Sequence, residues 1–599
     1  MKNLTRNILK IITALFIFYG CELNDDFLER QPLDEISNAS FWNTENDLMV
    51  FNQGFYDLVQ TDKTYPILFG HDRRFDSHRI SYLHYDGMSD NTAPRHGRHS
   101  SYAQIRAGIH VAPSSKNANA PGGWYGYEGF ELIRAVNIGL ANYDNADVSD
   151  AVKNHYKGEA RLMRAMFYAR LIRDFGTAQW VDQEVTTADE EILNGERDSR
   201  DFVMNKVLED LNFAVANLRD NGDKIKLSKS QALHMKSRIC LLEGTWRKYH
   251  GLGNETSWLT HAADAAKALM DGGKYSLHKG APGRTYNELH SMEDIDSNSE
   301  VIHFVKYQLG VKANHVQSYH RGYNGGMTKN MVEDYLCSDG LPISLSPLYK
   351  GDAVYEDIWE NRDPRLRQTI MLPEDQPIYR YGNHDFGATT YPRIQGMPSG
   401  LKSYTGYHII KIYNVKSAHA GYSTSITPGL SMRYAETLLN YAEAKAELGN
   451  GSISQADLDI SINLLRDRDG MVHMTNNPPM DPRYAADGIS ALLVEIRRER
   501  RVELFMEGHR YNDLRRWGQG KKLENKDFGM RWDAANSSRF DPDGKTTVKT
   551  SEIDGVPYLE VYKGTDFENP VFDESKHYYW PLPLDVLSQN PNLKQNPGF

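Results

Sequence analysis

The stretch RRERRVELFMEGHRYNDLRRW, residues 497–517, carries seven arginines beside a short apolar run. Glu499, Glu503 and Glu507 recur at every fourth position, so a helix would place them on one stripe. Such regular glutamates argue against an arm that binds nucleic acid, because each carboxylate would repel phosphate. No single acid, base or nucleophile is set apart for catalysis. The pattern therefore predicts a packed helix whose arginines bind carboxylates of neighbouring helices through their forked donors.

Chain length and net charge also favour a protein with a packed core over one that binds nucleic acid. A chain of 599 residues with 40% hydrophobic content can bury a large core. The net charge of −11 is opposite to the basic balance that is typical of domains that grip nucleic acid. We therefore expect no nucleic-acid partner.

The N-terminus has the pattern of an export signal. Lys2, Arg6 and Lys10 precede an apolar run at 11–20, which is too short to span a bilayer, since that takes about 20 apolar residues. We predict a signal peptide over 1–20. Cys21, directly after Gly20, resembles the lipidated cysteine of bacterial lipoproteins; an ordinary cleaved signal with an incidental cysteine is the alternative. The polar residues 21–30 would then tether the lipid to the globule.

Hydrophobic periodicity predicts a mainly helical protein. The predicted helices cover 44–60, 128–146, 148–174, 199–219, 228–248, 256–271, 432–448, 455–468 and 488–507. Thr44 and either Ser228 or Ser230 are candidate caps, and Gly176 follows a predicted helix end. Several helices form pairs of about 34 residues, the length of a tetratricopeptide unit. The expected fold class is all-α dominated: a tetratricopeptide-like helix-pair scaffold with long irregular insertions at 62–125 and 272–430 and a few short strands, at 301–307 and 407–413.

Cysteine and histidine spacing favours neither a disulfide framework nor a metal centre. Cys240 and Cys337 are predicted to be buried free thiols rather than a bridge. His96 and His99 form an H-x-x-H pair, but no HExxH motif occurs and no cysteine lies near them. We expect no cofactor and no transition metal; a structural Ca²⁺ held by aspartate oxygens stays open as the alternative.

Several blocks of the sequence carry a resemblance to a known family. Residues 497–518 resemble the signature near the C-terminus of the SusD/RagB family of surface nutrient-binding lipoproteins. Further blocks that are similar to this family follow in its order, at 27–48, 131–140, 159–176, 328–343, 361–366, 433–449 and 580–599. The ordered set covers nearly the whole chain after the signal peptide.

The resemblance implies a fold and a function. It implies four tetratricopeptide-like helix pairs, with an irregular segment that carries the ligand site. It implies a lipid anchor on the outer face of the outer membrane, an oligosaccharide or sometimes a peptide as ligand, and a SusC-like TonB-dependent transporter as partner. It implies no enzymatic activity. Within one compact globule, 31–275 would hold the first helix pairs, and 276–599 the ligand loops and the last helix pairs.

A sugar site needs aromatic faces for stacking and polar groups for the hydroxyls. Tyrosines outnumber phenylalanines by 35 to 21 and gather in the two irregular regions from which, by the resemblance, the site is built. The predicted ligand-binding residues are Arg73, Tyr82, Tyr85, Asn91, Tyr307, Tyr319, Tyr323 and Asn324. Trp124 and Trp359 are interpreted as scaffold.

Two other functions compete with this interpretation. A surface glycoside hydrolase would need two carboxylates about 5 to 10 Å apart across a cleft, and no motif nominates such a pair. A peptide-binding uptake or adaptor protein would use the helix pairs themselves, as repeat scaffolds often do.

Overall fold

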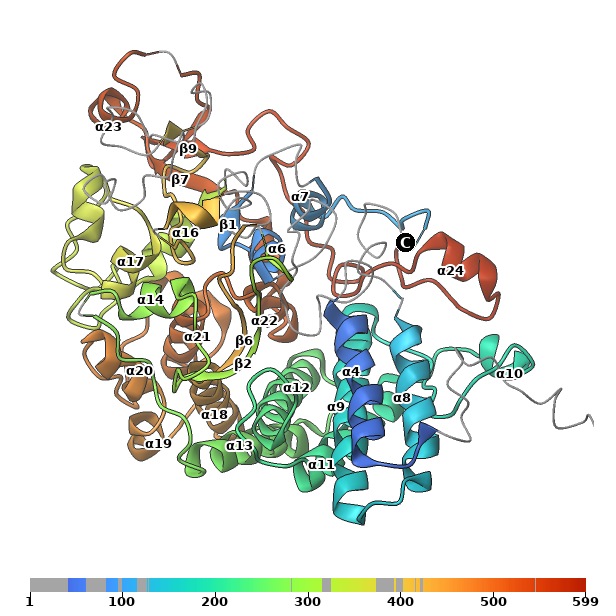
Figure 1. Ribbon diagram of the computed structural model, residues 1–599. Coiled ribbons are helices and arrows are strands. Elements are labelled where there is room, and N and C mark those ends of the chain that lie inside the picture. The colour runs from blue at the N-terminus through green and yellow to red at the C-terminus, as the bar shows by residue number, and fades with distance from the viewer. Residues whose placement is uncertain are drawn as a thin grey trace, which may run out of the picture.

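A frame of paired helices occupies the lower part of the molecule in Figure 1, and short strands and helices gather above it. The structure is a computed structural model that describes residues 41–60, 82–94, 100–115, 127, 129–281, 283–314, 325–372, 393–394, 402–414, 416–420, 424–544 and 546–599. The frame consists of α4 (Glu45–Gln60), α8 (Phe130–Asn142), α9 (Asp150–Phe175), α11 (Arg200–Asn217), α12 (Lys229–His250), α13 (Glu255–Asp271), α18 (Tyr434–Leu448) and α21 (Ala491–Glu503).

Consecutive frame helices pack side by side. Helix α9 packs against α8 and α11, α12 against α11 and α13, and α18 against α13 and α21. Their shared core is apolar and fully buried, with Leu162, Phe167 and Leu171 of α9 at 0% exposure. The predicted helix-pair fold class is therefore confirmed.

Shorter elements decorate the frame. The helices are α6 (Tyr82–Gly87), α7 (Ser100–Ala107), α10 (Glu190–Leu193), α14 (Thr285–Ser291), α16 (Lys329–Asp334), α17 (Pro364–Thr369), α19 (Gln455–Asp459), α20 (Ile462–Asp469), α22 (Arg510–Arg516), α23 (Ala534–Phe540) and α24 (Leu584–Gln589). The strands are β1 (Thr92–Ala93), β2 (Val301–Val305), β3 (Gly326–Met327), β4 (Arg393–Ile394), β5 (Lys402–Ser403), β6 (Gly429–Arg433), β7 (Phe528–Arg531), β8 (Thr550–Ile553) and β9 (Val556–Glu560). They form the pairs β1–β3, β2–β6 and β4–β5 and the three-stranded sheet β7–β9–β8.

Three predicted helix caps are confirmed. Thr44 Oγ1 accepts a hydrogen bond from Asp47 N at 3.3 Å at the start of α4. Ser228, not Ser230, caps α12 in a capping box with Gln231. Gly176, with φ +83°, ends α9, a conformation that favours glycine.

Two predicted elements differ from the structure. The helix predicted over 455–468 is two helices, α19 and α20, separated at Ile460 and Ser461. The strand predicted over 407–413 is wrong: among the described residues, this segment makes an isolated bridge from Ile409 to Ile370 and then turns, with Tyr413 N donating to Ile410 O at 3.0 Å. The isoleucines of this run are buried, and the described residues beside them, 369–372, form no more than that bridge.

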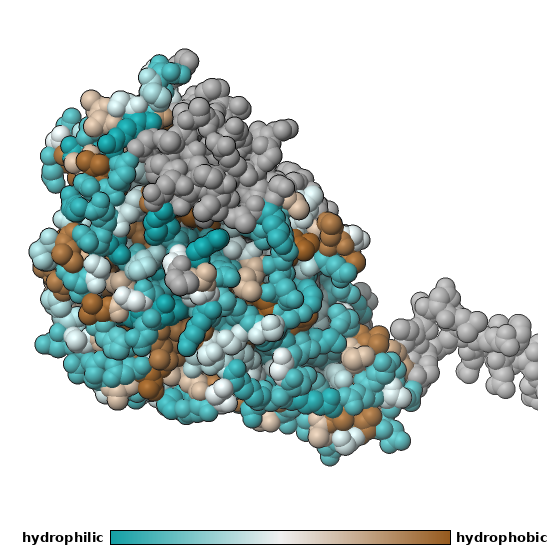
Figure 2. All heavy atoms as spheres, turned by 60° about the vertical axis from the view of Figure 1, so that its left-hand side comes forward, coloured by the Kyte–Doolittle hydropathy of each residue, from teal (hydrophilic) through white to brown (hydrophobic). Residues whose placement is uncertain are grey.

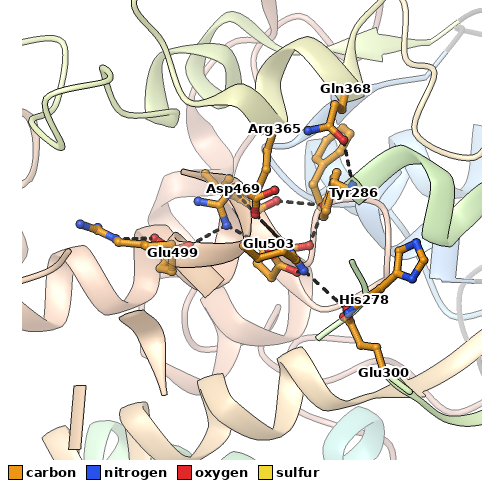
Figure 3. A network of polar contacts seen from close by, with 12 residues as sticks. His278, Tyr286, Glu300, Arg365, Gln368, Asp469, Glu499 and Glu503 are labelled. Carbon is orange, nitrogen blue, oxygen red and sulfur yellow. Dashed lines mark hydrogen bonds and ion pairs between the residues drawn. The ribbon is translucent and has the colours of Figure 1, made fainter. Parts of the chain in front are cut away.

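The arginines of the opening stretch lie in the interior, where carboxylates surround them. Every residue of α21 from Leu492 to Glu503 is buried. Figure 3 shows the centre of the network: Glu503 accepts from Arg365 Nη1 at 2.9 Å, and it also binds Arg433 at 2.6 Å and Arg468 at 2.7 Å. These cations come from α17, β6 and α20, three elements far apart in sequence. The predicted packed helix with inter-element ion pairs is confirmed.

The free thiols are also confirmed, since Cys240 and Cys337 are buried and unbridged. Across the described part of the chain, no helix is long and apolar enough to cross a membrane.

The surface mixes polar and apolar residues. Figure 2 shows one face of the molecule, on which hydrophilic residues predominate and hydrophobic ones are scattered among them. Exposed large apolar side chains such as Val50, Leu193 and Val571 come from separate parts of the chain. Single apolar residues among polar ones, as on this face, are ordinary on protein surfaces.

Candidate functional site

The two irregular regions meet at a pair of short antiparallel strands. Thr92 of β1 pairs with Met327 of β3, and Ala93 pairs with Gly326. Thr328 extends the contact, donating from its backbone N to Asn91 O at 3.0 Å and from Oγ1 to Asp90 O at 2.6 Å. We call residues 86–94 and 325–334 the loop junction. It brings together the two segments from which the predicted ligand residues come.

Close backbone packing holds the loop junction to the strands beside it. Met327 N donates to Tyr407 O at 3.1 Å, and Met530 N of β7 donates to Thr405 O at 2.7 Å. A Cβ on Gly326 would lie 2.0 Å from Thr405 Oγ1, so only glycine fits at this position without a shift. The junction is therefore continuous, through 405–407, with the sheet formed by β7, β8 and β9.

Arg501 of α21 binds both halves of the junction. Its Nε donates to Asn91 Oδ1 at 2.9 Å and its Nη1 donates to Asn330 Oδ1 at 2.8 Å. The same guanidinium also binds Asp334 of α16 and lies 3.1 Å from Asp90. The side chain of Arg501 is only 1% exposed, so these bonds form away from water and depend strongly on one another.

Two junction aspartates have pKa values shifted in opposite directions. Burial raises the pKa of the Asp86 carboxyl to about 6. Burial would also raise the pKa of Asp90, but Arg501 and Arg510 beside it lower that pKa well below its usual range. Asp90 is thus held as an anion within the ion network, while Asp86 accepts hydrogen bonds from Asn91 Nδ2 at 2.7 Å and Gly508 N at 2.8 Å.

Three predicted ligand residues have buried side chains. Tyr85 is 6% exposed, Asn91 is 1% exposed and Tyr307 is 5% exposed. Tyr85 stacks on Trp580 with ring centroids 6.4 Å apart, and Asn91 already binds Arg501 and Asp86. In this arrangement they support the surface rather than form it, and a ligand role for them stays a prediction.

Most of the other predicted positions lie outside the described residues. These are Arg73, Tyr319, Tyr323, Asn324 and the predicted lipidation site Cys21. Tyr82 begins α6. Trp359, interpreted as scaffold, packs edge-on against Tyr355, with centroids 5.6 Å apart; Trp124 also lies outside the described residues.

A second feature, which the sequence did not nominate, lies beside Tyr85. It is a small hollow, with a cavity volume of about 90 Å³, between α9, α11 and α12. It is lined by Met166, Ala169, Arg170, Ile172, Arg173, Arg200, Met204, Met235, Arg238, Ile239, Leu242 and Glu243, and we call it the arginine hollow. Arg173 Nη2 donates to Tyr85 Oη at 2.8 Å, which connects the hollow to α6 and so to the loop junction. The sequence feature that could have indicated this hollow is the pair Arg170 and Arg173, which lie one helical turn apart. The helix that carries them was interpreted only as scaffold.

The described residues contain no group of three or more His, Cys, Asp or Glu side chains placed to hold a metal ion. The predicted absence of a cofactor, and the alternative of a bound Ca²⁺, both stay predictions.

Comparison with known proteins identifies the family. A sequence profile of the SusD family matches residues 290–599, more than half of the chain. The chain belongs to the SusD family. A SusD-like protein of Bacteroides ovatus is 23% identical over 98% of this chain and 97% of its own length. A SusD-like protein of Formosa agariphila, P2, is 23% identical over 79% of each chain.

Solved SusD-like structures share the fold. A SusD-like carbohydrate binding protein from Bacteroides fragilis superposes with a TM-score of 0.69 at 23% identity, covering 93% of this chain and all of its own. A laminarin binding SusD-like protein gives a TM-score of 0.55 at 17% identity, again over 93% of this chain and 100% of its own. At these identities the likeness establishes the architecture, which agrees with the family assignment.

Proposed function

We propose that this SusD-family protein is a cell-surface lipoprotein that binds an oligosaccharide and passes it to a SusC-like TonB-dependent transporter without chemical conversion. The observation that carries the proposal is the loop junction. In it, the C-terminal ends of two segments that are rich in Tyr, Arg, His and Asn, 73–91 and 306–326, meet on the helical frame. Binding residues commonly lie on loops that such a frame positions.

The frame holds the loop junction in place. Arg501 and Arg510 fix Asp90 through charge-assisted bonds, the latter at 2.7 Å from Nε to Oδ1. Buried and fully bonded groups of this kind keep the residues that follow them in one conformation. A preorganised surface loses little conformational entropy when a flexible sugar chain binds.

Relatives support a carbohydrate as the ligand class. One solved relative is described as carbohydrate binding and another as laminarin binding. Stacking on tyrosine and hydrogen bonds from arginine and asparagine are the contacts that such a ligand would need. The apolar signal, Cys21 and the polar residues after it support surface anchoring through lipid.

Binding and turnover are measured together to test the proposal. The protein is titrated calorimetrically with laminarin and with a panel of neutral and acidic oligosaccharides, and each mixture is then analysed for cleavage products. Saturable binding without products is the expected result. Release of shorter sugars would show that the protein is a glycoside hydrolase instead. Binding of peptides and of no glycan would show that it is a peptide-uptake protein.

Anchoring and partnership need a separate experiment in cells. A Cys21→Ala variant should lose incorporation of radiolabelled palmitate and leave the membrane fraction. The wild type, solubilised from outer membranes in mild detergent, should co-purify with a TonB-dependent transporter. A Cys21→Ala protein that keeps palmitate and stays in the membrane fraction would contradict the anchor, and wild type recovered alone would contradict the partner.

A further inference from the structure

Met506 has a backbone conformation that few residues of its kind adopt. Its φ is +61°, in the left-handed region, where the Cβ of a bulky side chain comes too close to the following carbonyl oxygen. The other described non-glycine residues with a positive φ are three asparagines and one aspartate, which tolerate this region: Asn254, Asn361, Asn450 and Asp554. The side chain of Met506 is 1% exposed and packs in an apolar cluster that includes Val502 and Phe505. Packing therefore holds Met506 in a strained conformation.

The strained residue lies in the turn that joins α21 to α22, residues 504–509, which we call the α21–α22 turn. Buried side chains from both irregular regions bind the backbone of this turn. From the first region, Asp86 Oδ2 accepts from Gly508 N at 2.8 Å. From the second, Lys411 Nζ donates to Phe505 O. Asp86 and Lys411 are both 0% exposed, so the turn keeps its conformation through buried contacts with residues far away in the sequence.

The residues on either side of the turn hold the loop junction. Arg501 Nη2, before the turn, lies 3.1 Å from Asp90 Oδ2, and Arg510 Nε, after the turn, donates to Asp90 Oδ1 at 2.7 Å. Helix α6, which leads into the loop junction, packs against α22 (Figure 1). A change in the turn would move one arginine relative to the other, and Asp90 could not stay bound to both. The turn and the loop junction are therefore coupled through Asp90.

The two halves of the loop junction are also coupled to each other. Strand β1 pairs with β3, and Thr328 Oγ1 donates to Asp90 O at 2.6 Å. Arg501, which binds Asp90, also donates from Nη1 to Asn330 Oδ1 at 2.8 Å. Neither half can leave the frame alone without breaking these bonds.

We infer that the α21–α22 turn is a strained joint, which opens together with both halves of the loop junction as one cooperative unit. Proteins open locally in such units, and the free energy of opening differs widely from one unit to another. The strain at Met506 makes this unit open more often than the paired helices of the frame, because opening relieves the strain.

Opening of the unit frees the loop junction from the frame while the paired helices stay folded. The loop junction can then rearrange when a ligand or a partner binds, without unfolding of the protein. The inference goes beyond the proposed function and does not depend on it, since it concerns the fold and not the class of ligand.

Native-state hydrogen exchange of the protein without ligand tests whether the unit exists. Exchange is followed by mass spectrometry at urea concentrations below the unfolding transition, in peptides that cover 86–94, 325–334, 504–509 and α9. We expect the first three segments to share one equilibrium constant of opening, about tenfold or more larger than that of α9. Separate opening of the three segments, or opening of all three only together with α9, overturns the inference.

Substitutions at Met506 test the strain. Met506→Ala and Met506→Gly both remove the buried side chain, but only glycine adopts a positive φ at no steric cost. We therefore expect the unit to open about fivefold less often in Met506→Gly than in Met506→Ala, at all three segments. The matched control is Leu504 in the same turn, which is also buried but has a φ of −96°. There the order should reverse, with Leu504→Gly opening more often than Leu504→Ala.

Two results of the substitutions would overturn the inference. If Met506→Gly opens as often as Met506→Ala, or more often, the turn is not strained. If the two variants differ at 504–509 but not at 86–94 and 325–334, the turn is not coupled to the loop junction. Thermal unfolding of all variants is recorded first. If neither Met506 variant folds, shared or separate opening of the three segments in the wild type decides the inference.

Discussion

Arg501 Nε donates to Asn91 Oδ1 at 2.9 Å, so a helix of the frame directly holds the segment that leads out of α6. The same guanidinium binds Asp334 and Asn330 of α16. One buried side chain thus ties both halves of the loop junction to α21. Removing it leaves Asp90 with Arg510, and Asp334 with Arg498.

We expect Arg501→Ala to lower the free energy of unfolding by about 3–5 kcal/mol, because it leaves buried carboxylates without one of their cations. Arg501→Lys should lose less, since it keeps the charge but not the fork of donors. Urea unfolding followed by circular dichroism measures both. Wild-type stability of Arg501→Ala would mean that the ion network does not hold the fold together.

The dependence of the free energy of unfolding on pH should reflect the opposite pKa shifts of Asp86 and Asp90. Asp86 has a pKa of about 6 in the folded protein against 3.8 for an ordinary aspartate, so its contribution to stability is fully present below pH 3.8 and is lost as the pH rises towards 6. The pKa of Asp90 is lowered, so its contribution is present above pH 3.8 and is lost as the pH falls below that value.

Urea unfolding at intervals from about pH 2.5 to about pH 7 gives the free energy of unfolding as a function of pH. The fall in stability above pH 3.8, due to Asp86, is the upper limb of this profile, and the fall below pH 3.8, due to Asp90, is the lower limb. Burial also raises the pKa of Asp527 to about 6, so this carboxyl contributes to the upper limb as well. The contribution of Asp86 is therefore obtained by comparing the profile of the wild type with that of the variant. Asp86→Asn should flatten the profile between about pH 4 and 6, and Asp90→Asn should flatten it below about pH 4. An upper limb that is unchanged in Asp86→Asn would show that this carboxyl titrates normally.

Close packing at Gly326 makes a steric prediction. A Cβ at this position meets Thr405 Oγ1 at 2.0 Å, Ser403 Oγ at 2.4 Å and Tyr407 O at 2.8 Å. Gly326→Ala should therefore cost about 1–3 kcal/mol of stability and weaken ligand binding, because the loop junction must shift. Thermal unfolding and titration with the best ligand of the panel measure both effects.

The control is a glycine in open space. Gly54 lies on α4 without a positive φ, and a Cβ at this position would meet no atom of the described residues within 4 Å. Gly54→Ala should stabilise the protein by about 0.5–1 kcal/mol, since alanine loses less conformational entropy in a helix. Equal effects of the two substitutions would refute the packing argument at the junction.

The sequence was sufficient for the frame because its helices depend on local patterns. Periodic apolar residues, Thr44, Ser228 and Gly176 place the starts and ends of helices through contacts within a few residues. The strand prediction at 407–413 failed because a strand depends on a partner. The isoleucines there are buried beside Lys411, whose Nζ donates to Phe505 O and Glu507 rather than leaving the chain extended in a ladder.

The candidate site was predictable in kind but not in detail. The regular glutamates of 497–517 indicated internal ion pairs, yet Arg501 binds Asp334, which lies 167 positions away, and Asp90 O, which lies 411 positions away. Spacing along a helix carries no information about such partners. The arginine hollow was missed for the same reason, because α9, α11 and α12 each contribute part of its lining.

Tyr319 and Tyr323 provide the most direct prediction about ligand contact. Both belong to the glycine-containing segment that precedes β3, and an aromatic ring there would stack on a sugar face. Tyr319→Ala or Tyr323→Ala should weaken oligosaccharide binding about three- to tenfold while leaving thermal unfolding nearly unchanged. The matched control is Phe202→Ala on α11, whose side chain is 45% exposed and lies on the frame. Phe202→Ala should leave both the affinity for the oligosaccharide and the thermal unfolding nearly unchanged. If instead the tyrosine variants lower stability and bind the oligosaccharide as wild type does, these side chains belong to the core and do not contact the ligand.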